Sequence, residues 1–363
     1  PAQVLSWFKR ATLAPEIDSP KVQCFLTPAT IMYGGWEKRR WRSLVLLVTS
    51  VLALGFSSAR VREQLLHETD PRNRRKLASF EPETVMEDLR EGFYGDIDSI
   101  SIAVGGYHTC ALEYRPGVDF GGPVRCWGRN DWGQSSPSDD VFVQVSAGDR
   151  HTCGIKIDQT VSCWGHMRFA PRGLFQQLGV GGHHTCALRR EGRVICWGDD
   201  VEGCVSGVPE EATFVQVVAG RDNSCGLRPN GKVTCWGSNS MGQSSPPRSE
   251  QFRQLSASTS RHICGVTLGG AIRCWGRDMR GEAQAREGPW KLVTCGQWTT
   301  CGIRQTDGGV ECWGLTKVNK TASFYDEVSS GDYHTCAVTS EGELECWGSA
   351  QKAEQVPAGF LVA

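Results

Sequence analysis

Cysteines at a short, repeated spacing are the residues of this sequence whose chemistry is easiest to define. The chain of 363 residues has 17 cysteines, and seven pairs of them are separated by ten to sixteen positions. Such pairs form disulfides in an oxidising compartment. In a reducing compartment the cysteines would stay free and act as small buried hydrophobic residues. Because both members recur in all seven repeats, we expect disulfides. The expected pairs are Cys110–Cys126, Cys153–Cys163, Cys186–Cys196, Cys225–Cys235, Cys264–Cys274, Cys301–Cys312 and Cys336–Cys346.

Histidines are the second recurring group with possible chemistry. Five repeats place a histidine two positions before the first cysteine, and the other two have Asn223 and Thr299 there. Metal ligands must lie within about 2 Å of one ion, whereas equivalent positions of separate repeats stand well apart. We therefore expect each histidine to hydrogen-bond a neighbouring backbone group, and we predict no metal and no cofactor. The histidines are His108, His151, His184, His262 and His334.

Other catalytic patterns are weak in this sequence. The glycines before the strands, such as Gly148 and Gly181, lack the lysine and the helix of a phosphate-binding loop, and no Gly-x-Ser-x-Gly elbow occurs. Acidic residues such as Asp139 and Glu210 lie in variable loops without a repeated partner. We therefore predict no catalytic residue. A formal net charge of −1 also argues against nucleic acid as a partner.

A hairpin must position each cysteine pair. In the third repeat, residues 184–188 and 193–197 are expected as strands, joined by a three-residue loop that ends at Gly192 in the left-handed conformation. That loop pairs position 189 with 193, so Cys186 and Cys196 face each other on adjacent antiparallel strands, within reach of a disulfide.

The repeats predict the architecture. Successive Cys-Trp-Gly triplets are 37, 33, 39, 39, 38 and 34 residues apart. A unit of about 35–40 residues with three or four short strands is a propeller blade, so seven units predict an all-β, seven-bladed β-propeller. The triplet tryptophans are expected to pack between blades. Residues 355–362 resemble the start of a repeat, and we expect them to help close the ring.

Two recurring motifs resemble a known family. The segments His184-Thr185-Cys186-Ala187-Leu188 and Asn130-Asp131-Trp132-Gly133-Gln134, with Gly-x-Val-x-Cys-Trp-Gly, look like the regulator-of-chromosome-condensation-like repeat family in its cysteine-rich exported branch. The resemblance spans residues 97–363. It implies a seven-bladed propeller used mainly for protein contacts, which include guanine-nucleotide exchange in one member and β-lactamase inhibition in another relative.

The region before the repeats predicts a membrane anchor. We divide the chain into a leader (1–37), a transmembrane anchor with a basic flank (38–59), a charged connector with a short helix (60–96) and the propeller (97–363). Residues 43–59 carry no charge, a length at the short end for a bilayer-spanning helix. A signal peptide is the competing interpretation. The basic cluster at 38–42 leaves the leader inside and exports the propeller.

These features together predict a non-catalytic, single-pass membrane protein that is a scaffold or accessory subunit of a larger membrane complex. Its exported side is a cell exterior, periplasm, thylakoid lumen or intermembrane space. The alternatives are an exported receptor or inhibitor that binds a soluble protein, and an enzyme with a central-channel site. Function should lie where the repeats differ, and Tyr114, Arg115 and Phe120 in the first-repeat insertion are the expected partner contacts. Asn319-Lys320-Thr321 is a glycosylation sequon that matters only in a secretory pathway.

Overall fold

The computed structural model describes residues 101–114, 121–348, 356 and 360–362. The expected leader, anchor and connector lie outside these residues. Within the described residues no helix has the length and apolar character needed to cross a membrane. The segment 96–363 forms one compact unit, to which all of the following refers.

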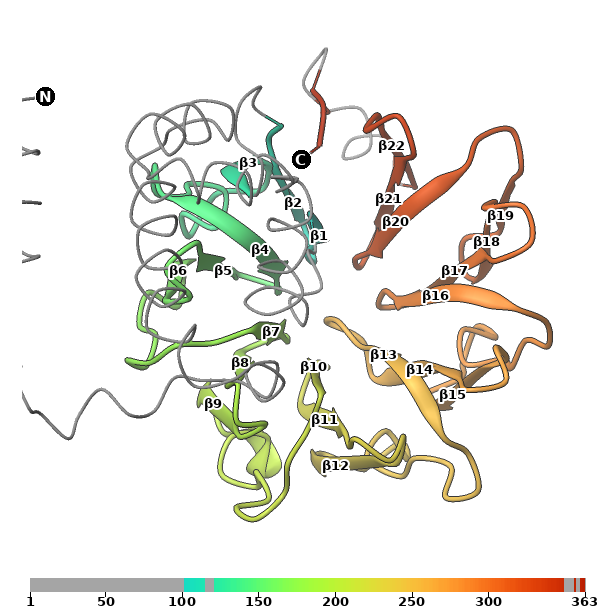
Figure 1. The fold of residues 1–363 in the computed structure, drawn as a ribbon, viewed down its shortest axis with the longest axis horizontal. Helices are drawn as coiled ribbons and strands as arrows, with labels where there is room; N and C mark the ends of the chain where they lie inside the picture. Colours follow the sequence, from blue (N-terminus) through green and yellow to red (C-terminus); the bar gives the residue numbers. More distant parts are fainter. Residues whose placement is uncertain (1–100, 115–120, 349–355, 357–359, 363) are drawn as a thin grey trace, which may run out of the picture. The chain divides into compact units, whose positions relative to one another are not determined.

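The described chain folds into seven antiparallel β-units, which we call blades 1 to 7, arranged around a common centre (Figure 1). Blades 1 and 2 share one six-stranded sheet, because Gly122 pairs with Phe142 and Pro123 with Val141, and each of the other blades is a separate sheet. Blade 1 contains β1 (Ile102–Val104), β2 (His108–Leu112) and β3 (Gly122–Gly128), and blade 2 contains β4 (Val141–Ala147), β5 (His151–Lys156) and β6 (Val161–Gly165). Blade 3 contains β7 (Gln177–Val180), β8 (His184–Leu188) and β9 (Val194–Gly198), and blade 4 contains β10 (Gln216–Ala219), β11 (Asn223–Leu227) and β12 (Val233–Gly237). Blade 5 contains β13 (Phe252–Ser256), β14 (His262–Thr267) and β15 (Ile272–Gly276). Blade 6 contains β16 (Trp290–Cys295), β17 (Thr299–Arg304), β18 (Val310–Gly314) and β19 (Val318–Lys320), and blade 7 contains β20 (Tyr325–Ser330), β21 (His334–Thr339) and β22 (Leu344–Gly348). The all-β propeller is therefore confirmed.

The turn between the second and third strands follows the expected chemistry. Gly192 has φ 82°, the left-handed conformation in which a β-carbon is costly. In the second blade Gln159 replaces the glycine and still adopts φ 67°. The turn geometry is thus imposed by the strand register, in which Cys186 pairs with Cys196, and not by glycine alone.

Six of the seven triplet tryptophans pack in apolar clusters shared by two blades, and Trp197 is buried outside these clusters. Trp236 of blade 4 lies 5.9 Å, centroid to centroid, from Phe214 of its own inner strand region, and both join a cluster with Leu188 and Val194 of blade 3. The Trp236 indole N–H donates to the carbonyl of Cys204 at 3.0 Å. Burying two aromatic rings per junction supplies the apolar area that a thin three-stranded sheet lacks by itself.

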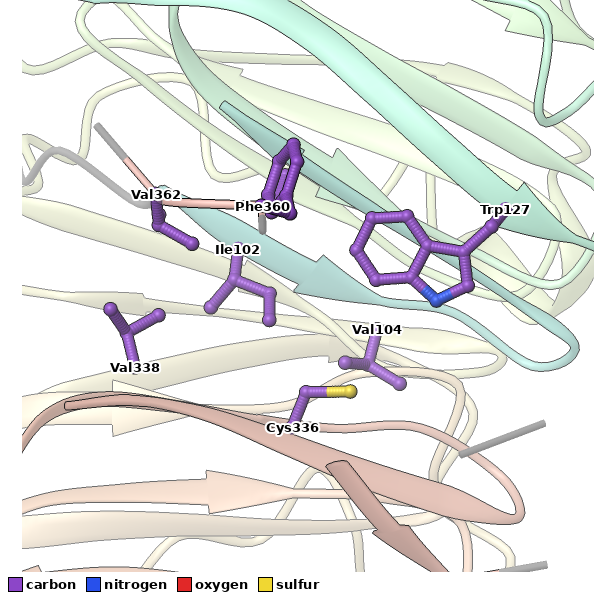
Figure 2. Close-up of a cluster of buried hydrophobic side chains, with 8 residues drawn as sticks. Ile102, Val104, Trp127, Cys336, Val338, Phe360 and Val362 are labelled. Carbon is purple, nitrogen blue, oxygen red and sulfur yellow. The ribbon is translucent and has the colours of Figure 1, made fainter. Parts of the chain in front are cut away.

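The C-terminal segment closes the ring between blades 7 and 1, as expected. Phe360 lies 5.8 Å from Trp127, centroid to centroid, and takes the place that Phe214 takes beside Trp236 (Figure 2). Val362 forms a bridge with Glu113 of blade 1, and Leu361 forms one with Glu343 of blade 7. The last residues therefore contact both blades at the junction where the two ends of the propeller meet.

Candidate protein-interaction face

Most cysteines and histidines of the described chain lie inside the blades. The cysteines form seven disulfides. All seven expected cysteine pairs are joined, each across the second and third strands of one blade, with Cα–Cα distances of 4.0–4.1 Å. Regularly spaced disulfides of this kind indicate an oxidising compartment. They hold the blades and leave no free sulfur for catalysis at these positions.

The five histidines bond the next blade, and the expectation of a backbone partner was wrong. Each ring Nε2 lies within hydrogen-bond distance of a hydroxyl one position before the first cysteine of the following blade. Blade 7 follows the same rule and bonds blade 1, so the series runs across the closure of the ring. The pairs are His108–Thr152 (2.6 Å), His151–Thr185 (2.9 Å), His184–Ser224 (2.7 Å), His262–Thr300 (2.7 Å) and His334–Thr109 (2.6 Å).

Burial keeps four of these imidazoles neutral. It lowers the pKa of His108, His151 and His262 to about 3 and that of His184 to about 4. A neutral imidazole with one nitrogen on a hydroxyl is a structural joint, because proton transfer at physiological pH would need a pKa near 7. Two blades lack the histidine. Blade 5 offers Ile263 instead of a hydroxyl, and blade 4 correspondingly has Asn223, whose amide donates to the Gln243 carbonyl at 3.2 Å. Blade 6 has Thr299, which accepts from the Thr316 N–H at 3.2 Å, although blade 7 offers the Thr335 hydroxyl.

Glutamines join the inner strands in a second series. Gln216 accepts from the Leu255 N–H at 2.7 Å and donates to the Leu255 carbonyl at 3.1 Å, so one side chain mimics a strand partner. Gln144 makes the same two hydrogen bonds to Leu178 of the next blade: it accepts from the N–H and donates to the carbonyl. Within the described chain, the matching residue of blade 6 is Leu292, which has no group for such a bond.

Glu327 occupies the glutamine position at the closure of the ring. Its carboxylate accepts from the backbone N–H groups of Ser101 (3.1 Å) and Ile102 (3.2 Å) and from the Ser101 hydroxyl. Burial raises the pKa of Glu327 to about 7, and the three hydrogen bonds act in the opposite direction. Among the residues described, Glu327 is therefore the one titratable side chain in this series of contacts, and it lies at the junction between blades 7 and 1.

The inner strands surround a cavity of about 670 Å³. Its lining continues to Asp326 and Ser340 at one end and stops at Ser258 near the other. Eight positions separate Gln254 from His262 in blade 5, against seven between Gln177 and His184, so this loop is one residue longer. Its buried Thr259 donates to Asp332 of blade 7, a blade that is not its neighbour. The extra residue thus lets blade 5 reach across the ring.

The loops at that end form what we call the recognition face. It consists of the turn between the first and second strands of each blade and the segment directly after the third strand. Backbone bonds link the two: the Arg129 N–H donates to Tyr107, and the His166 N–H donates to Arg150, both at 2.9 Å. The same link recurs in blades 3 to 6, so these loops have a fixed backbone frame.

Three blades extend this frame with a rigid turn whose tip varies. In blade 1, Gln134 is fully buried and accepts from the Trp132 N–H at 2.9 Å, while Asn130 accepts from the Ser135 N–H at 3.0 Å. Gln243 holds the turn of blade 4 through the Met241 N–H, and Glu282 holds that of blade 5 through the Arg280 N–H. The three tips are Asp131-Trp132, Ser240-Met241 and Met279-Arg280.

Aromatic and arginine side chains gather around these tips. Trp132 is 42% exposed, with its ring centroid 5.0 Å from that of His166 and 5.5 Å from the Arg150 guanidinium. The rings of Tyr107 and Tyr333 are also in contact, tilted by 45° with their centroids 5.1 Å apart and their hydroxyls 3.2 Å apart. Such side chains are enriched at the energetic centres of protein interfaces.

Charged and polar side chains lie together at the floor of the recognition face. Asp149 lies 4.0 Å from both Arg221 and His183. Burial raises the pKa of Asp149 and lowers that of His183, while Arg221 opposes the first shift. Arg277 pairs with the buried Glu282 at 3.0 Å, which connects this floor to the turn of blade 5.

Of the three partner contacts expected from the sequence, the structure describes Tyr114, which lies away from the recognition face. Tyr114 is 50% exposed and follows β2, whereas Tyr107 precedes it, so the two tyrosines stand at opposite ends of one strand. The Tyr114 N–H donates to the Leu361 carbonyl of the closing segment at 3.0 Å. Arg115 and Phe120 lie outside the described residues. Tyr114 remains a candidate contact on the face opposite the recognition face.

The remaining described cysteines are buried thiols. Burial raises the pKa of Cys204 to about 11 and that of Cys295 to about 12. Cys295 lies with His262 and Cys264 in a group whose ligand atoms are within 4.8 Å of one another. Cys264 forms a disulfide with Cys274, and His262 hydrogen-bonds Thr300. Two of the three possible metal ligands therefore already have other partners.

These observations define a class: a disulfide-stapled β-propeller with one rigid, variable face. A family model described as the regulator of chromosome condensation (RCC1) repeat matches residues 142–169, 175–204, 214–243 and 326–352. The chain therefore contains RCC1 repeats, and its cysteine pairs fit the exported branch of that family.

Two solved receptor ectodomains are similar in fold and sequence. The ectodomain of the receptor kinase CR4 from Physcomitrella patens is 25% identical, with a TM-score of 0.58, over 69% of this chain and 73% of that one. The CRINKLY WD40 ectodomain of the receptor kinase ACR4 from Arabidopsis thaliana is also 25% identical, with a TM-score of 0.57, over 69% of this chain and 97% of that one. This likeness and the disulfides indicate an exported domain.

Two further matches are more limited. Prp20p from Saccharomyces cerevisiae is 18% identical, with a TM-score of 0.53, over 64% of this chain and 80% of that chain, and shows the fold alone. A serine/threonine-protein kinase-like protein CCR2 of Arabidopsis thaliana is 35% identical over 81 residues, which are 18% of this chain. The match spans about a tenth of the length of that curated relative.

Proposed function

We propose that this chain is a non-catalytic, membrane-anchored propeller that binds a partner protein through its recognition face, as a scaffold or accessory subunit of a larger membrane complex. The observation that carries the proposal is the set of three turns in blades 1, 4 and 5. Their frames are held by buried Gln134, Gln243 and Glu282, and their tips differ. A preorganised backbone loses little entropy on binding, so side-chain identity at the tips determines the partner.

The composition of the recognition face supports a protein partner. Trp132, Tyr333 and Met279 are 42%, 43% and 66% exposed, and arginines stand beside the aromatic rings. Exposed aromatic side chains supply large contact area at small entropic cost, and arginine is enriched with them at interface hot spots. The uncharged stretch at 43–59 supports the anchor, and the two receptor-kinase ectodomains support an exported position.

A crosslinking purification tests the proposal. The full chain is recovered from its native membranes with partners attached, and compared with Trp132→Ala and Met279→Ala. Loss of a central interface residue costs about 2 kcal/mol or more, which weakens binding roughly 30-fold. Ile157→Ala is the matched control, because Ile157 is 49% exposed and lies in the hairpin at the opposite face.

The outcomes separate the candidates. Membrane subunits that are lost from Trp132→Ala but kept by Ile157→Ala support the proposal. A soluble protein captured by the same face would support the second candidate, an exported receptor or inhibitor, which the likeness to receptor ectodomains favours. Retention of every partner by the recognition-face variants and loss in Tyr114→Ala would contradict the choice of face.

A further inference from the structure

We infer that Asn319 is an N-glycosylation site whose glycan covers the free outer edge of blade 6. The inference rests on the proposed export, because the acceptor sequence Asn319-Lys320-Thr321 is modified only in a secretory pathway. It is the single Asn-x-Ser/Thr sequence in the 363 residues. Sequence alone leaves its burial open, and the structure supplies that information.

Strand β19 puts Asn319 on the outermost edge of its blade. Blade 6 is the only described unit with a fourth strand, and β19 pairs with β18 alone (Figure 1). Asn319 is the exposed central residue of β19, between half-buried Val318 and Lys320. Thr321 is exposed as well. Both residues that define the acceptor are therefore open to solvent.

The contacts of β19 orient the acceptor amide. Lys320 bonds Glu345 of blade 7 and lies 5.2 Å from the Trp347 ring, so the alternate side chain of the strand faces the neighbouring blade. Asn319 instead contacts Arg304, whose guanidinium donates to Oδ1 at 3.1 Å. Within the described residues, nothing hydrogen-bonds the Asn319 Nδ2, which is the atom that glycosylation uses.

N-glycosylation transfers a sugar from a lipid carrier to the Asn319 amide. The amide nitrogen of Asn319 attacks C1 of a sugar carried on a lipid pyrophosphate. The C1–N bond forms, the C1–O bond to the pyrophosphate breaks, and the amide proton leaves with the lipid pyrophosphate. The folded blade accommodates the product, because β19 has no strand beyond it among the described residues. A glycan there also shields an unpaired strand edge, a common site of unwanted association.

Expression of the full chain in a eukaryotic secretory host tests the inference. We expect one glycan, removed by peptide N-glycosidase and mapped to Asn319 by mass spectrometry, that is absent from Asn319→Gln and Thr321→Ala and kept in Lys320→Gln. Lys232→Thr is the positive control, because it creates an acceptor at Asn230, which is exposed and lies in a hairpin.

The readouts separate this inference from the proposed export. In cells that glycosylate Lys232→Thr at Asn230, a chain with seven intact disulfides and an unmodified Asn319 would overturn the glycan inference and leave export standing. Free thiols at the fourteen paired cysteines would contradict export itself, and the glycan inference with it.

Discussion

The junctions inside the ring and the tips of the recognition face come from the same repeat and vary in opposite ways. At the junctions, His184 bonds Ser224 and Gln216 bonds Leu255, and other blades use the same residue types for the same contacts. At the tips, the frame is kept while Trp132 in blade 1 becomes Met241 in blade 4. Repetition therefore marks what folding requires, and variation within a rigid frame marks where recognition is expected. Changes at the two regions should separate stability from binding.

Removing a junction tryptophan should have the largest effect on stability. Trp236→Ala empties a buried site between blades 3 and 4 and should lower the free energy of unfolding by about 3–5 kcal/mol. Trp132→Ala, on the exposed tip, should cost less than about 1 kcal/mol. Chemical denaturation measures both values, and equal losses would mean that the junctions and tips are wrongly distinguished.

Removing one disulfide should have the next largest effect. Replacing Cys186 and Cys196 together by alanine opens a loop of ten positions, which costs about 3 kcal/mol in the unfolded-chain model. Thermal unfolding of the double variant measures the loss. Peptide mapping without reduction provides the prior check, and free thiols at the paired positions of the unmodified protein would rule out this account of the junctions.

The closing junction should respond to pH in a way that the glutamine junctions do not. Burial raises the pKa of Glu327 from 4.5 to about 7, so the folded protein holds this proton more tightly than the unfolded chain. The resulting stability is full below about pH 4.5 and is lost as pH rises through 7. Glu327→Gln, which matches the glutamines of blades 2 to 5, should remove this dependence and gain about 3 kcal/mol relative to the unmodified protein at alkaline pH.

Denaturation at about pH 5 and about pH 8 measures that difference. Gln216→Glu is the matched control, because it should introduce a similar dependence at an ordinary junction. A pH response of Glu327→Gln equal to that of the unmodified protein would show that the closure is not set by this carboxyl.

A single histidine joint should have the smallest effect. His184→Ala removes the imidazole partner of the Ser224 hydroxyl, which keeps only the Cys186 Sγ at 3.3 Å, and should cost about 1–2 kcal/mol. Burial lowers the pKa of His184 to about 4, so the stability from the neutral ring is full above about pH 6.5 and is lost as pH falls through 4. A double-mutant cycle with Ser224→Ala measures the coupling, and additive losses would contradict the direct bond.

Local features of the fold were readable from the sequence, and contacts between blades were not. The ten-position spacing of Cys186 and Cys196 and the loop ending at Gly192 involve one hairpin, so their pairing followed from turn geometry. The partner of His184 is 40 positions away, at Ser224, and depends on how two blades align. A signal was present in the joint change to Asn223 and Ile263, whose meaning required the structure.

The same limit applied to the candidate site. The insertion around Tyr114 was conspicuous because its length differs between repeats. The tips at Trp132, Met241 and Arg280 have equal lengths and differ only in their side chains. From the sequence they were therefore interpreted as ordinary parts of the repeat and not as a binding site. Their common position on one face comes from backbone bonds such as that from Arg129 to Tyr107, which join segments more than twenty positions apart.

The most direct test measures stability and partner capture together for Trp236→Ala and Trp132→Ala in the full membrane-derived chain. The account predicts a crossed result. Trp236→Ala should melt at a lower temperature and, while folded, keep its partner, whereas Trp132→Ala should melt as the unmodified protein does and lose the partner about 30-fold. Partner loss in proportion to the fall in melting temperature for both variants would contradict the division between junctions and tips.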